Sequence, residues 1–336
     1  MPNNRLTLED VADRVGVHQS TVSRALQNSP LISQQTKKRI LDTVKKLKYR
    51  PNIIARSLAI NRTGLIGLII PDIKNPFCAE VIEYFEEAAR HRNFRLILSI
   101  TDGELAREED AILDFSGRVD GIIINHHQSY TNCKAILELQ REKFPFVLLG
   151  WIKGTKASYV MADLSEGAYL ATRHLLELGH RRIAFMLAGN DNDILRLRGY
   201  KKALKEFGVE FRKELLVESG EEISGAERFM DKILSMKEKP TAIYAINDLL
   251  AIGIMDACEK RGLKIPGDFA LVGFDNIKLS AHSRFSITTV DYPLKELAKI
   301  AMNVLQDQIE GRMEEPEQIL IKPTLVVRRS SGAKIV

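Results

Sequence analysis

The sequence predicts two architectures in one chain: a small all-α domain at the N-terminus, then an α/β core of two lobes, each with a doubly wound parallel sheet. Residues 1–50 are mostly amphipathic and rich in Lys and Arg. A proline and a candidate helix cap interrupt the chain within residues 49–60. Apolar strands and amphipathic helices alternate from residue 63 onward, a pattern typical of α/β folds.

Composition suits a globular chain of two or three domains, since the 336 residues are 45% hydrophobic and 28% charged. No apolar leader follows the first residues, and no stretch approaches the ~20 apolar residues that span a bilayer. We therefore expect a cytoplasmic protein without a membrane partner. Cys78, Cys133 and Cys258 are widely spaced and form no CxxC pair. We expect no disulfide, metal or cofactor.

The positive charge is concentrated at the N-terminus. Up to Arg62 there are twelve Lys and Arg against four Asp and Glu, a net charge of +8, whereas the rest of the chain carries −3. A basic segment on a mildly acidic body indicates a polyanion partner for that segment alone. By charge alone, a solvated charged face stays an alternative.

The first helices have a recognisable spacing. Thr7 and Asp10 fit a capping box that opens a helix over residues 8–15. Gly16 ends this helix, because a tight turn needs a residue that tolerates positive φ. A second helix over residues 19–26 then packs on the first. This spacing is a helix-turn-helix, and in a basic domain it predicts DNA binding.

A third helix and a hinge complete the N-terminal region. Ser33 is an N-cap candidate for a helix to about residue 47, whose apolar positions, Ile40, Leu41, Val44 and Leu47, complete the core. Pro51 disfavours helix at the residue before it, and Asn52 can cap a new helix over residues 53–60. Two turns are unstable alone in water, so this helix should form only with outside support. It is a candidate coupling element.

From residue 65 the pattern changes to buried strands separated by helices. In the first lobe we expect strands over 65–70, 95–100, 121–124 and 146–149, with helices around 77–91, 104–115 and 131–141. In the second we expect strands over 183–187, 242–246 and 270–274, with helices over about 163–175, 196–207, 224–234 and up to 258. A last helix over about 293–310 follows. Two such lobes form a ligand cleft at the carboxyl ends of their strands.

Three segments carry a family resemblance: LEDVADRVGV from Leu8, STVSRAL from Ser20 and RPNIIARSL from Arg50. They resemble the LacI/GalR family of bacterial transcription regulators, over nearly the whole chain. The resemblance implies a periplasmic-binding-protein-like core, a homodimer or tetramer, a near-palindromic operator DNA and a small effector. Its implied domains are 1–50 (helix-turn-helix), 51–62 (hinge helix and linker) and 63–336 (effector binding and dimerisation). Within the core, lobe 1 takes 63–161 plus 290–321, and lobe 2 takes 162–289 plus 322–332.

The resemblance also implies DNA-contacting residues. Gln19, Ser20 and Arg24 occupy positions that read base edges, and Thr21 and Ser23 occupy positions that contact phosphate. The chemistry agrees, because Arg pairs with guanine and Gln with adenine, while hydroxyl groups suit phosphate.

One residue at the start of the second helix departs from the family pattern. His18 stands where the family has a Ser or Thr cap. His18 can have either of two roles: it caps the helix poorly, or its side chain contacts a phosphate directly.

In the hinge, Asn52 caps the helix and Ala55 occupies the close-contact position. The resemblance places Leu58 where family members insert a wedge into the minor groove, which unstacks a base step in exchange for contacts with bent DNA. The alternative for Leu58 is packing between domains.

The family's effector-contacting positions fall on loops that follow strand ends. They are Asp72, Asn75, Phe77, Arg196, Asn247 and Asp275, with Trp151 able to stack on a ring. A guanidinium, an amide and a carboxylate together suit the paired hydroxyls of a sugar, and also a nucleobase edge or a carboxylate.

The alternatives are structural: caps at Asn75 and Asn247, a turn at Asp275, and a surface helix position for Arg196. The chain also lacks the Asp-Arg pair and the aromatic residue of many sugar-binding members, so a ligand other than a simple hexose stays open.

The sequence thus predicts a sequence-specific transcription regulator, a repressor, controlled by a small metabolite, with a sugar or sugar derivative favoured. Two alternatives stay open: a solute-binding receptor without a DNA role, and a regulator controlled by a protein co-regulator. We do not expect an enzyme, since His126 and His127 are adjacent in an extended segment and cannot chelate one metal together. The sequence does not decide whether the effector is an inducer or a corepressor, which operator sequence is bound, or whether the protein is a dimer or a tetramer.

Overall fold

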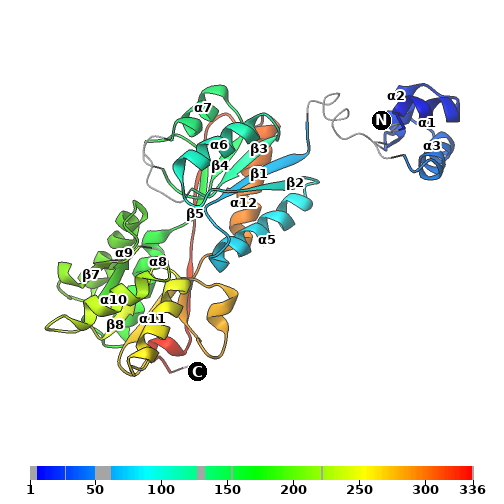
Figure 1. Cartoon of the computed structure of the whole chain (residues 1–336). Helices are drawn as coiled ribbons and strands as arrows, with labels where there is room; N and C mark the ends of the chain where they lie inside the picture. The colour runs from blue at the N-terminus through cyan, green and yellow to red at the C-terminus, as the bar shows by residue number, and fades with distance from the viewer. Residues whose placement is uncertain are drawn as a thin grey trace. The chain divides into compact units, whose positions relative to one another are not determined.

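The computed structural model describes residues 6–26, 28–49, 62–126, 133–152, 154–220 and 222–334. Contacts divide the chain into two compact units, Met1–Gly64 and Leu65–Val336 (Figure 1). Each unit has its own hydrophobic core. The predicted hinge helix, with Asn52, Ala55 and Leu58, lies outside the described residues.

The N-terminal unit is built from α1 (Leu8–Val15), α2 (Gln19–Leu26) and α3 (Gln34–Lys46). Its core residues come from all three helices and from the segment after α3: Val11, Ala12, Val15, Val22, Ala25, Ile40 and Tyr49. The predicted helix-turn-helix is confirmed, but the inward position of Leu41 is wrong, since this side chain is 44% exposed. Each helical residue turns by about 100°, so Ile40 points inward and its neighbour does not.

Local hydrogen bonds explain where α1 begins and ends. Asp10 N–H donates to Thr7 Oγ1 at 3.2 Å, and Thr7 N–H donates to Asp10 Oδ2 at 2.6 Å, which completes the predicted capping box. Gly16 has φ +73° and donates its N–H to the carbonyl of Ala12. The guanidinium of Arg39 on α3 donates to the carbonyl of Val15, which ties α3 to the end of α1.

Lobe 1 of the larger unit contains a six-stranded sheet in the order β11-β5-β4-β3-β1-β2, with all neighbours parallel. Its strands are β1 (Leu65–Ile70), β2 (Arg95–Ile100), β3 (Gly121–Ile124), β4 (Phe146–Leu148), β5 (Tyr159–Ala162) and β11 (Gln318–Ile321). Its helices are α5 (Pro76–Arg90), α6 (Leu105–Ser116), α7 (Lys134–Glu142) and α12 (Leu294–Ile309).

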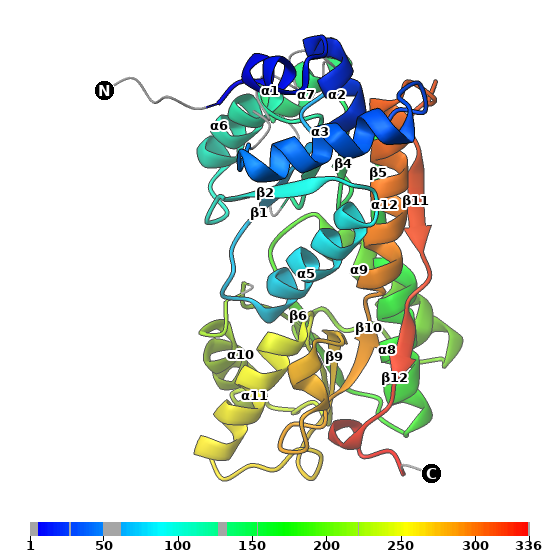
Figure 2. The ribbon, with the colours of Figure 1, turned by 90° about the vertical axis from the view of Figure 1, so that its right-hand side faces the viewer.

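Both faces of this sheet are buried. On β1, Leu68 and Ile70 pack in one cluster with α5 and α12, whereas Ile69 packs in the other with α6 and α7. Alternate strand residues point to opposite faces, so a run of apolar residues such as Leu65–Ile70 is the expected signature of a doubly covered strand. Figure 2 shows α5 and α12 together in front of this sheet.

Lobe 2 contains the sheet β12-β10-β9-β8-β6-β7. Its strands are β6 (Ile183–Leu187), β7 (Leu216–Glu218), β8 (Ala242–Tyr244), β9 (Ala270–Asp275), β10 (Thr288–Asp291) and β12 (Thr324–Val326). Helices α8 (Leu164–Glu177) and α9 (Asn192–Glu206) cover one face, and α10 (Gly225–Leu234) and α11 (Asp248–Lys260) cover the other. The two doubly wound sheets are confirmed, with β12 as the one antiparallel edge strand among the described residues.

The chain crosses between the lobes three times: between β5 and α8, between β10 and α12, and between β11 and β12. Figure 2 shows the last crossing as a continuous segment beside α12. Each crossing lies close to a point where the resemblance implies a change of lobe, near residues 161, 290 and 321. The finer domain boundaries remain predictions.

Five short strands, β5, β7 and β10 to β12, were not assigned from the sequence. Each has only three or four residues. The equally short β3, β4 and β8 were predicted because they stand in clear apolar runs between two helical patterns. Among the described residues, no helix is long and apolar enough to cross a membrane. The three cysteines are buried, and none of them forms a disulfide bond.

Candidate functional site

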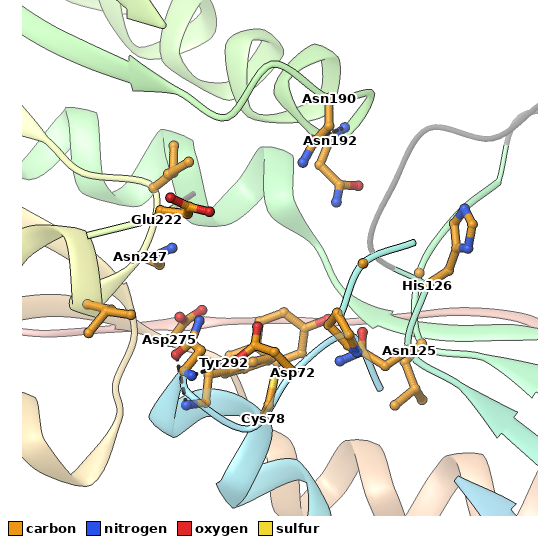
Figure 3. A pocket seen from close by; sticks show the side chains of 18 of the residues that line it. Asp72, Cys78, Asn125, His126, Asn190, Asn192, Glu222, Asn247, Asp275 and Tyr292 are labelled. Carbon is orange, nitrogen blue, oxygen red and sulfur yellow. Dashed lines mark hydrogen bonds between the residues drawn. The ribbon is translucent and has the colours of Figure 1, made fainter. Parts of the chain in front are cut away.

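A cavity of about 750 Å³ lies between the two lobes, at the carboxyl ends of their strands. Side chains enter it from loops after β1, β2, β3 and β4 in lobe 1, and from loops after β6, β8 and β9 in lobe 2. Figure 3 shows polar groups projecting into this space from several sides, including Asp72 and Asn125 from lobe 1 and Asn192 and Asn247 from lobe 2. Parallel strands place their loops at one edge, which explains this convergence.

All seven residues predicted for the effector site line this one cavity: Asp72, Asn75, Phe77, Trp151, Arg196, Asn247 and Asp275. They come from segments up to about 200 residues apart in the chain. Their roles in ligand binding remain predictions.

The lobe 1 wall is organised by the loop between β1 and α5. Asp72 Oδ1 accepts the backbone N–H groups of Lys74 at 2.6 Å and Asn75 at 2.8 Å. Asn75 Oδ1 in turn accepts the N–H of Phe77 at 3.0 Å and caps α5. The structural alternative for Asn75 is therefore correct, and the same residue also lines the cavity. These hydrogen bonds hold the loop that carries Asp72 and the start of the helix that carries Phe77.

In the lobe 2 wall, too, one residue both caps a helix and lines the cavity. Asn247 Oδ1 accepts the N–H of Leu250 at 2.7 Å and caps α11, so its amide nitrogen is the group directed to other partners. Asp275 ends β9 with φ +106°, outside the usual regions for a non-glycine residue. The neighbouring Asn276 donates to Asp291 at 2.7 Å and accepts from Arg328, which anchors this turn.

Arg196 lines the cavity with a guanidinium group whose hydrogen-bonding capacity is not satisfied by the described protein residues. Its Nε and Nη1 atoms are buried and have no hydrogen-bond acceptor among the described residues. The guanidinium carbon lies 5.8 Å from the centroid of the Phe274 ring, which supports the group from one side. Unpaired buried donors are costly, so this guanidinium is suited to an acceptor brought by a ligand.

A second unsatisfied group lies close by. The hydroxyl of Tyr244 is fully buried and has no hydrogen-bond partner in the described chain. Burial raises the pKa of Tyr244, the positive charge of Arg196 opposes this rise, and the carboxylate of Asp275 adds to it. The hydroxyl is therefore neutral and interacts electrostatically with Arg196 and Asp275, although Tyr244 is not itself a lining residue of the cavity.

Aromatic side chains form the base of the cavity near the crossings. The rings of Phe77 and Tyr292 meet edge to face with centroids 5.2 Å apart, so lobe 1 and the β10–α12 crossing touch through them. Burial raises the pKa of Tyr292 to about 12, and the charge of Asp275 acts in the same direction. Trp151 is half buried and packs against the lobe 2 core.

Sequence reasoning missed several polar lining residues: Lys74, Asp102, Asn125, Asn190, Asp191, Asn192, Glu222 and Tyr292. Asp102 and Asn125 follow the ends of β2 and β3, so the rule that ligands bind at strand ends would have found them. The 190–192 loop is shaped by Asp193, whose carboxylate accepts the N–H of Gly189 at 2.7 Å. Glu222 lies in the segment where the resemblance implies the aromatic residue that this chain lacks, whereas no sequence signal identifies Tyr292.

His126 is paired with Glu108 in the interior of lobe 1. Its Nδ1 lies 2.6 Å from Oε1 of Glu108, and both side chains are 5% exposed. His126 also lines the cavity. In the described part of the chain, no group of three His, Cys, Asp or Glu residues could hold a metal ion.

Carboxylates outnumber cations in the cavity. Among its described lining residues, Asp72, Asp102, Asp191, Glu222 and Asp275 oppose Lys74 and Arg196. Asp102 is paired with Arg107, outside the lining. The electrostatic balance suits a neutral ligand with many hydroxyl groups better than an anion.

The second candidate site is the outer face of α2. Gln19, Ser20 and Arg24 are exposed, while Thr21 and Ser23 are half buried. Val22 and Ala25 are buried on the opposite face, so the polar side chains lie on the side of α2 that faces away from the core. Binding of DNA by these five side chains remains a prediction.

The contacts of His18 concern only one of its two predicted roles, the cap, and a contact with phosphate remains a prediction. The Nδ1 atom of His18 lies 3.2 Å from the backbone nitrogen of Ser20 and 2.9 Å from Ser20 Oγ, so His18 caps α2.

Two family models match the chain. Residues 7–52 match bacterial regulatory proteins of the lacI family, and residues 172–331 match a periplasmic-binding-protein-like domain.

Full-length relatives match as well. The HTH-type transcriptional repressor PurR of Erwinia tasmaniensis is 34% identical over 330 residues, covering 96% of both chains. Catabolite control protein A of Priestia megaterium is also 34% identical, over 97% of this chain and 99% of that protein.

Solved structures share the fold. The complex of the transcriptional regulator CelR with cellobiose has a TM-score of 0.74 at 27% identity, covering 97% of this chain and all of that one. A regulator from Enterococcus faecium with bound ribose has a TM-score of 0.70 at 30% identity, over 80% of this chain and 98% of that one. The lac repressor dimer bound to operator, at 24% identity, 98% and 99% coverage and a TM-score of 0.84, supports the fold alone.

Proposed function

The chain belongs to the lacI family of bacterial regulatory proteins and is a DNA-binding transcriptional repressor controlled by a small-molecule effector; from this premise we propose how its own residues bind DNA and effector. The α2 face with Gln19, Ser20 and Arg24 binds operator bases, and the Thr21 and Ser23 hydroxyls bind the backbone. The cavity between the lobes binds the effector. The relatives it matches are regulators rather than enzymes.

The buried guanidinium of Arg196 is the observation that supports effector binding most strongly. Its Nε and Nη1 atoms need acceptors that the described protein residues do not supply. A hydroxyl of the effector can accept from Arg196 and donate to the carboxylate of Asp275, which lines the same cavity. The amide nitrogen of Asn247 then contacts a further oxygen, and Phe77 and Trp151 cover the apolar face of the ligand.

The effector class that fits best is a neutral polyhydroxylated compound, a sugar or sugar derivative. Even with Asp102 paired to Arg107, the lining has more carboxylates than cations, and this excess of negative charge disfavours phosphosugars and sugar acids. The structural relatives with cellobiose and ribose bind compounds of this class. A cavity of about 750 Å³ has room for more than one sugar ring.

Control of DNA binding follows from the three crossings. Because only short connections join the lobes, a ligand that contacts both walls changes the angle between them by a hinge motion. The effector acts on the operator only through its different affinities for the two lobe arrangements.

We propose that the active form is a homodimer in which the β2 edge of lobe 1 contributes to the interface. β2 is the outer strand of its sheet, and its Leu98 and Ile100 side chains are 41% and 38% exposed. Exposed apolar groups on an unpaired edge favour association with another chain. A two-fold symmetric partner also suits an operator with two half-sites.

The test is a thermal-shift screen of the purified full-length protein against neutral sugars, sugar acids, phosphosugars, nucleosides and purine bases. A ligand at ~100 times its dissociation constant stabilises the folded state by about 2.7 kcal/mol. We expect a hit among neutral sugars that disappears in Arg196→Ala and persists in the surface control Arg90→Ala. A hit that survives Arg196→Ala contradicts this site, and a hit among anions contradicts the proposed class.

A further inference from the structure

The start of α2 contains an unusual cap. His18 precedes α2, and its carbonyl accepts the N–H groups of Thr21 at 2.8 Å and Val22 at 3.3 Å, so His18 occupies the N-cap position. Its ring supplies the capping acceptor: the backbone N–H of Ser20 donates to His18 Nδ1 at 3.2 Å. The hydroxyl Oγ of Ser20 lies 2.9 Å from the same ring nitrogen.

These two contacts determine where the protons lie. A histidine ring nitrogen either carries a hydrogen or offers one lone pair. The backbone N–H of Ser20 can only donate, so Nδ1 must be the acceptor and the ring proton belongs to Nε2. The Ser20 hydroxyl, 2.9 Å from Nδ1, donates its own proton to the same lone pair, so the N–H and the O–H share Nδ1 in a three-centre hydrogen bond. The outward side of Ser20 Oγ is left with lone pairs and no hydrogen.

We propose that His18 is a positioning residue that makes Ser20 a hydrogen-bond acceptor towards DNA. This inference rests on the proposed operator binding by α2. An acceptor can pair with the N6 amino group of adenine or the N4 amino group of cytosine, and not with the O6 or N7 atoms of guanine. Phosphate oxygens are acceptors too, so Ser20 in this state contacts a base rather than the backbone.

The exposure of both residues is consistent with this role. Ser20 and His18 are exposed, while Val22 on the same helix is buried in the core of the N-terminal unit. The pair therefore lies on the solvent side of α2 and adds little to packing. Substituting either residue changes the surface of α2 without opening a cavity in the core.

The first experiment identifies the base that Ser20 contacts. The full-length protein selects its operator from a randomised duplex library, and the selection is repeated with Ser20→Ala and with the control Ser29→Ala, which lies after α2. We expect Ser20→Ala to lose discrimination at one position of each half-site, and Ser29→Ala to retain the wild-type profile. An unchanged profile in Ser20→Ala contradicts the proposal.

The second experiment tests the direction of the hydrogen bond. Duplexes carry analogues at that base pair. Purine in place of adenine, or 2-pyrimidinone in place of cytosine, lacks the amino group, and 7-deazaadenine, or 7-deazaguanine opposite cytosine, lacks the N7 acceptor. We expect wild-type binding to weaken about 3- to 10-fold without the amino group and to be unaffected without N7. Ser20→Ala should be insensitive to both changes. A loss that follows removal of N7 overturns the proposal.

The role of His18 is tested with the same duplexes. His18→Asn keeps a side-chain oxygen that can accept from Ser20, so dependence on the amino group should persist. His18→Ala releases the Ser20 proton, so the dependence should decrease while helix content by circular dichroism stays unchanged. Equal dependence in His18→Ala and wild type excludes the positioning role. If the wild-type protein shows no sequence-specific binding, operator recognition by α2 is refuted. If it binds specifically but does not depend on the amino group of the base, only the role of Ser20 and His18 is refuted.

Discussion

The hydroxyl of Thr289 donates a 2.6 Å hydrogen bond to Oδ1 of Asp248, and both side chains are completely buried. Asp248 begins α11 directly after the cavity residue Asn247, whereas Thr289 lies on β10, the strand that leads to a crossing between the lobes. The N–H of Ile277 donates to Asp248 Oδ2 at 3.0 Å. One carboxyl group thus links a cavity wall, the turn after β9 and a crossing strand.

Asp248 should make stability depend on pH. Burial raises the pKa of Asp248 to about 7, against hydrogen bonds from Thr289 and Ile277 that lower it. A raised pKa means that the protonated group favours the folded state, a contribution fully present below about pH 4 and lost as the pH rises through about 7. We expect the free energy of unfolding in urea to fall between pH 5 and pH 8 by about 2 kcal/mol more in wild type than in Asp248→Asn.

The matched control for Asp248 is Asp231→Asn, since Asp231 is exposed on α10 and paired with Arg261. Its pH dependence should equal that of wild type. If Asp248→Asn shows the same fall as wild type, Asp248 does not titrate in this range.

The crossing of α8 and α9 depends on Gly199. A Cβ atom at this position would stand 1.9 Å from the carbonyl oxygen of Ser165 and 2.8 Å from the nitrogen of Tyr169, both backbone atoms. Backbone cannot move aside cheaply, so Gly199→Ala should destabilise the protein by about 3 kcal/mol or prevent folding. At Gly117 a Cβ meets nothing closer than 4.0 Å. Gly117→Ala should therefore leave the thermal midpoint nearly unchanged, and equal effects of the two variants would refute close packing at Gly199.

Asp275→Asn should separate effector binding from DNA binding. The change keeps the shape of the side chain and removes the charged acceptor proposed for an effector hydroxyl. Loss of a charge-assisted hydrogen bond weakens affinity about 10- to 100-fold. We expect this loss in calorimetric titration with the screened effector, while operator affinity without effector stays at the wild-type value. The control is again Asp231→Asn, and unchanged effector affinity in Asp275→Asn would remove Asp275 from the site.

Leu98→Lys should disrupt the proposed dimer. A charge on the exposed apolar edge of β2 opposes burial against a second copy and costs the folded monomer little, because Leu98 is already 41% exposed. We expect the molar mass from light scattering to shift from dimer towards monomer. Leu137 on α7 is similarly exposed at 47%, and Leu137→Lys should retain the wild-type mass. A dimeric Leu98→Lys would place the interface elsewhere.

Local signals predicted many element boundaries well. The capping box at Thr7 and Asp10 and the glycine at residue 16 gave both ends of α1, and the apolar run of β1 marked a doubly covered strand. These signals work because caps and periodicity depend on residues a few positions apart. β7 was missed for the same reason, since three residues at a sheet edge show no period and are selected by pairing with β6.

Local sequence signals do not predict which side chains line the cavity. Asn75 and Asn247 were open to two interpretations, a cap or a site residue, and each caps a helix while it lines the cavity. Tyr292 follows an unassigned strand and enters the cavity only because β10 leads there. Orientation of a loop towards a cleft depends on the neighbouring strands, which sequence spacing does not encode.

The sequence by itself determined the helix-turn-helix, the two α/β lobes and the family, because these rest on periodicity, caps and motifs that are local in the chain. Only the tertiary structure decided that Arg196 has buried donors without acceptors, that carboxylates dominate the cavity, and that the His18 ring accepts from Ser20. Burial and hydrogen-bond direction arise from the positions of atoms around a side chain. In the cavity these atoms come from segments brought together by the sheets, and at His18 they depend on a ring orientation that the order of residues does not specify.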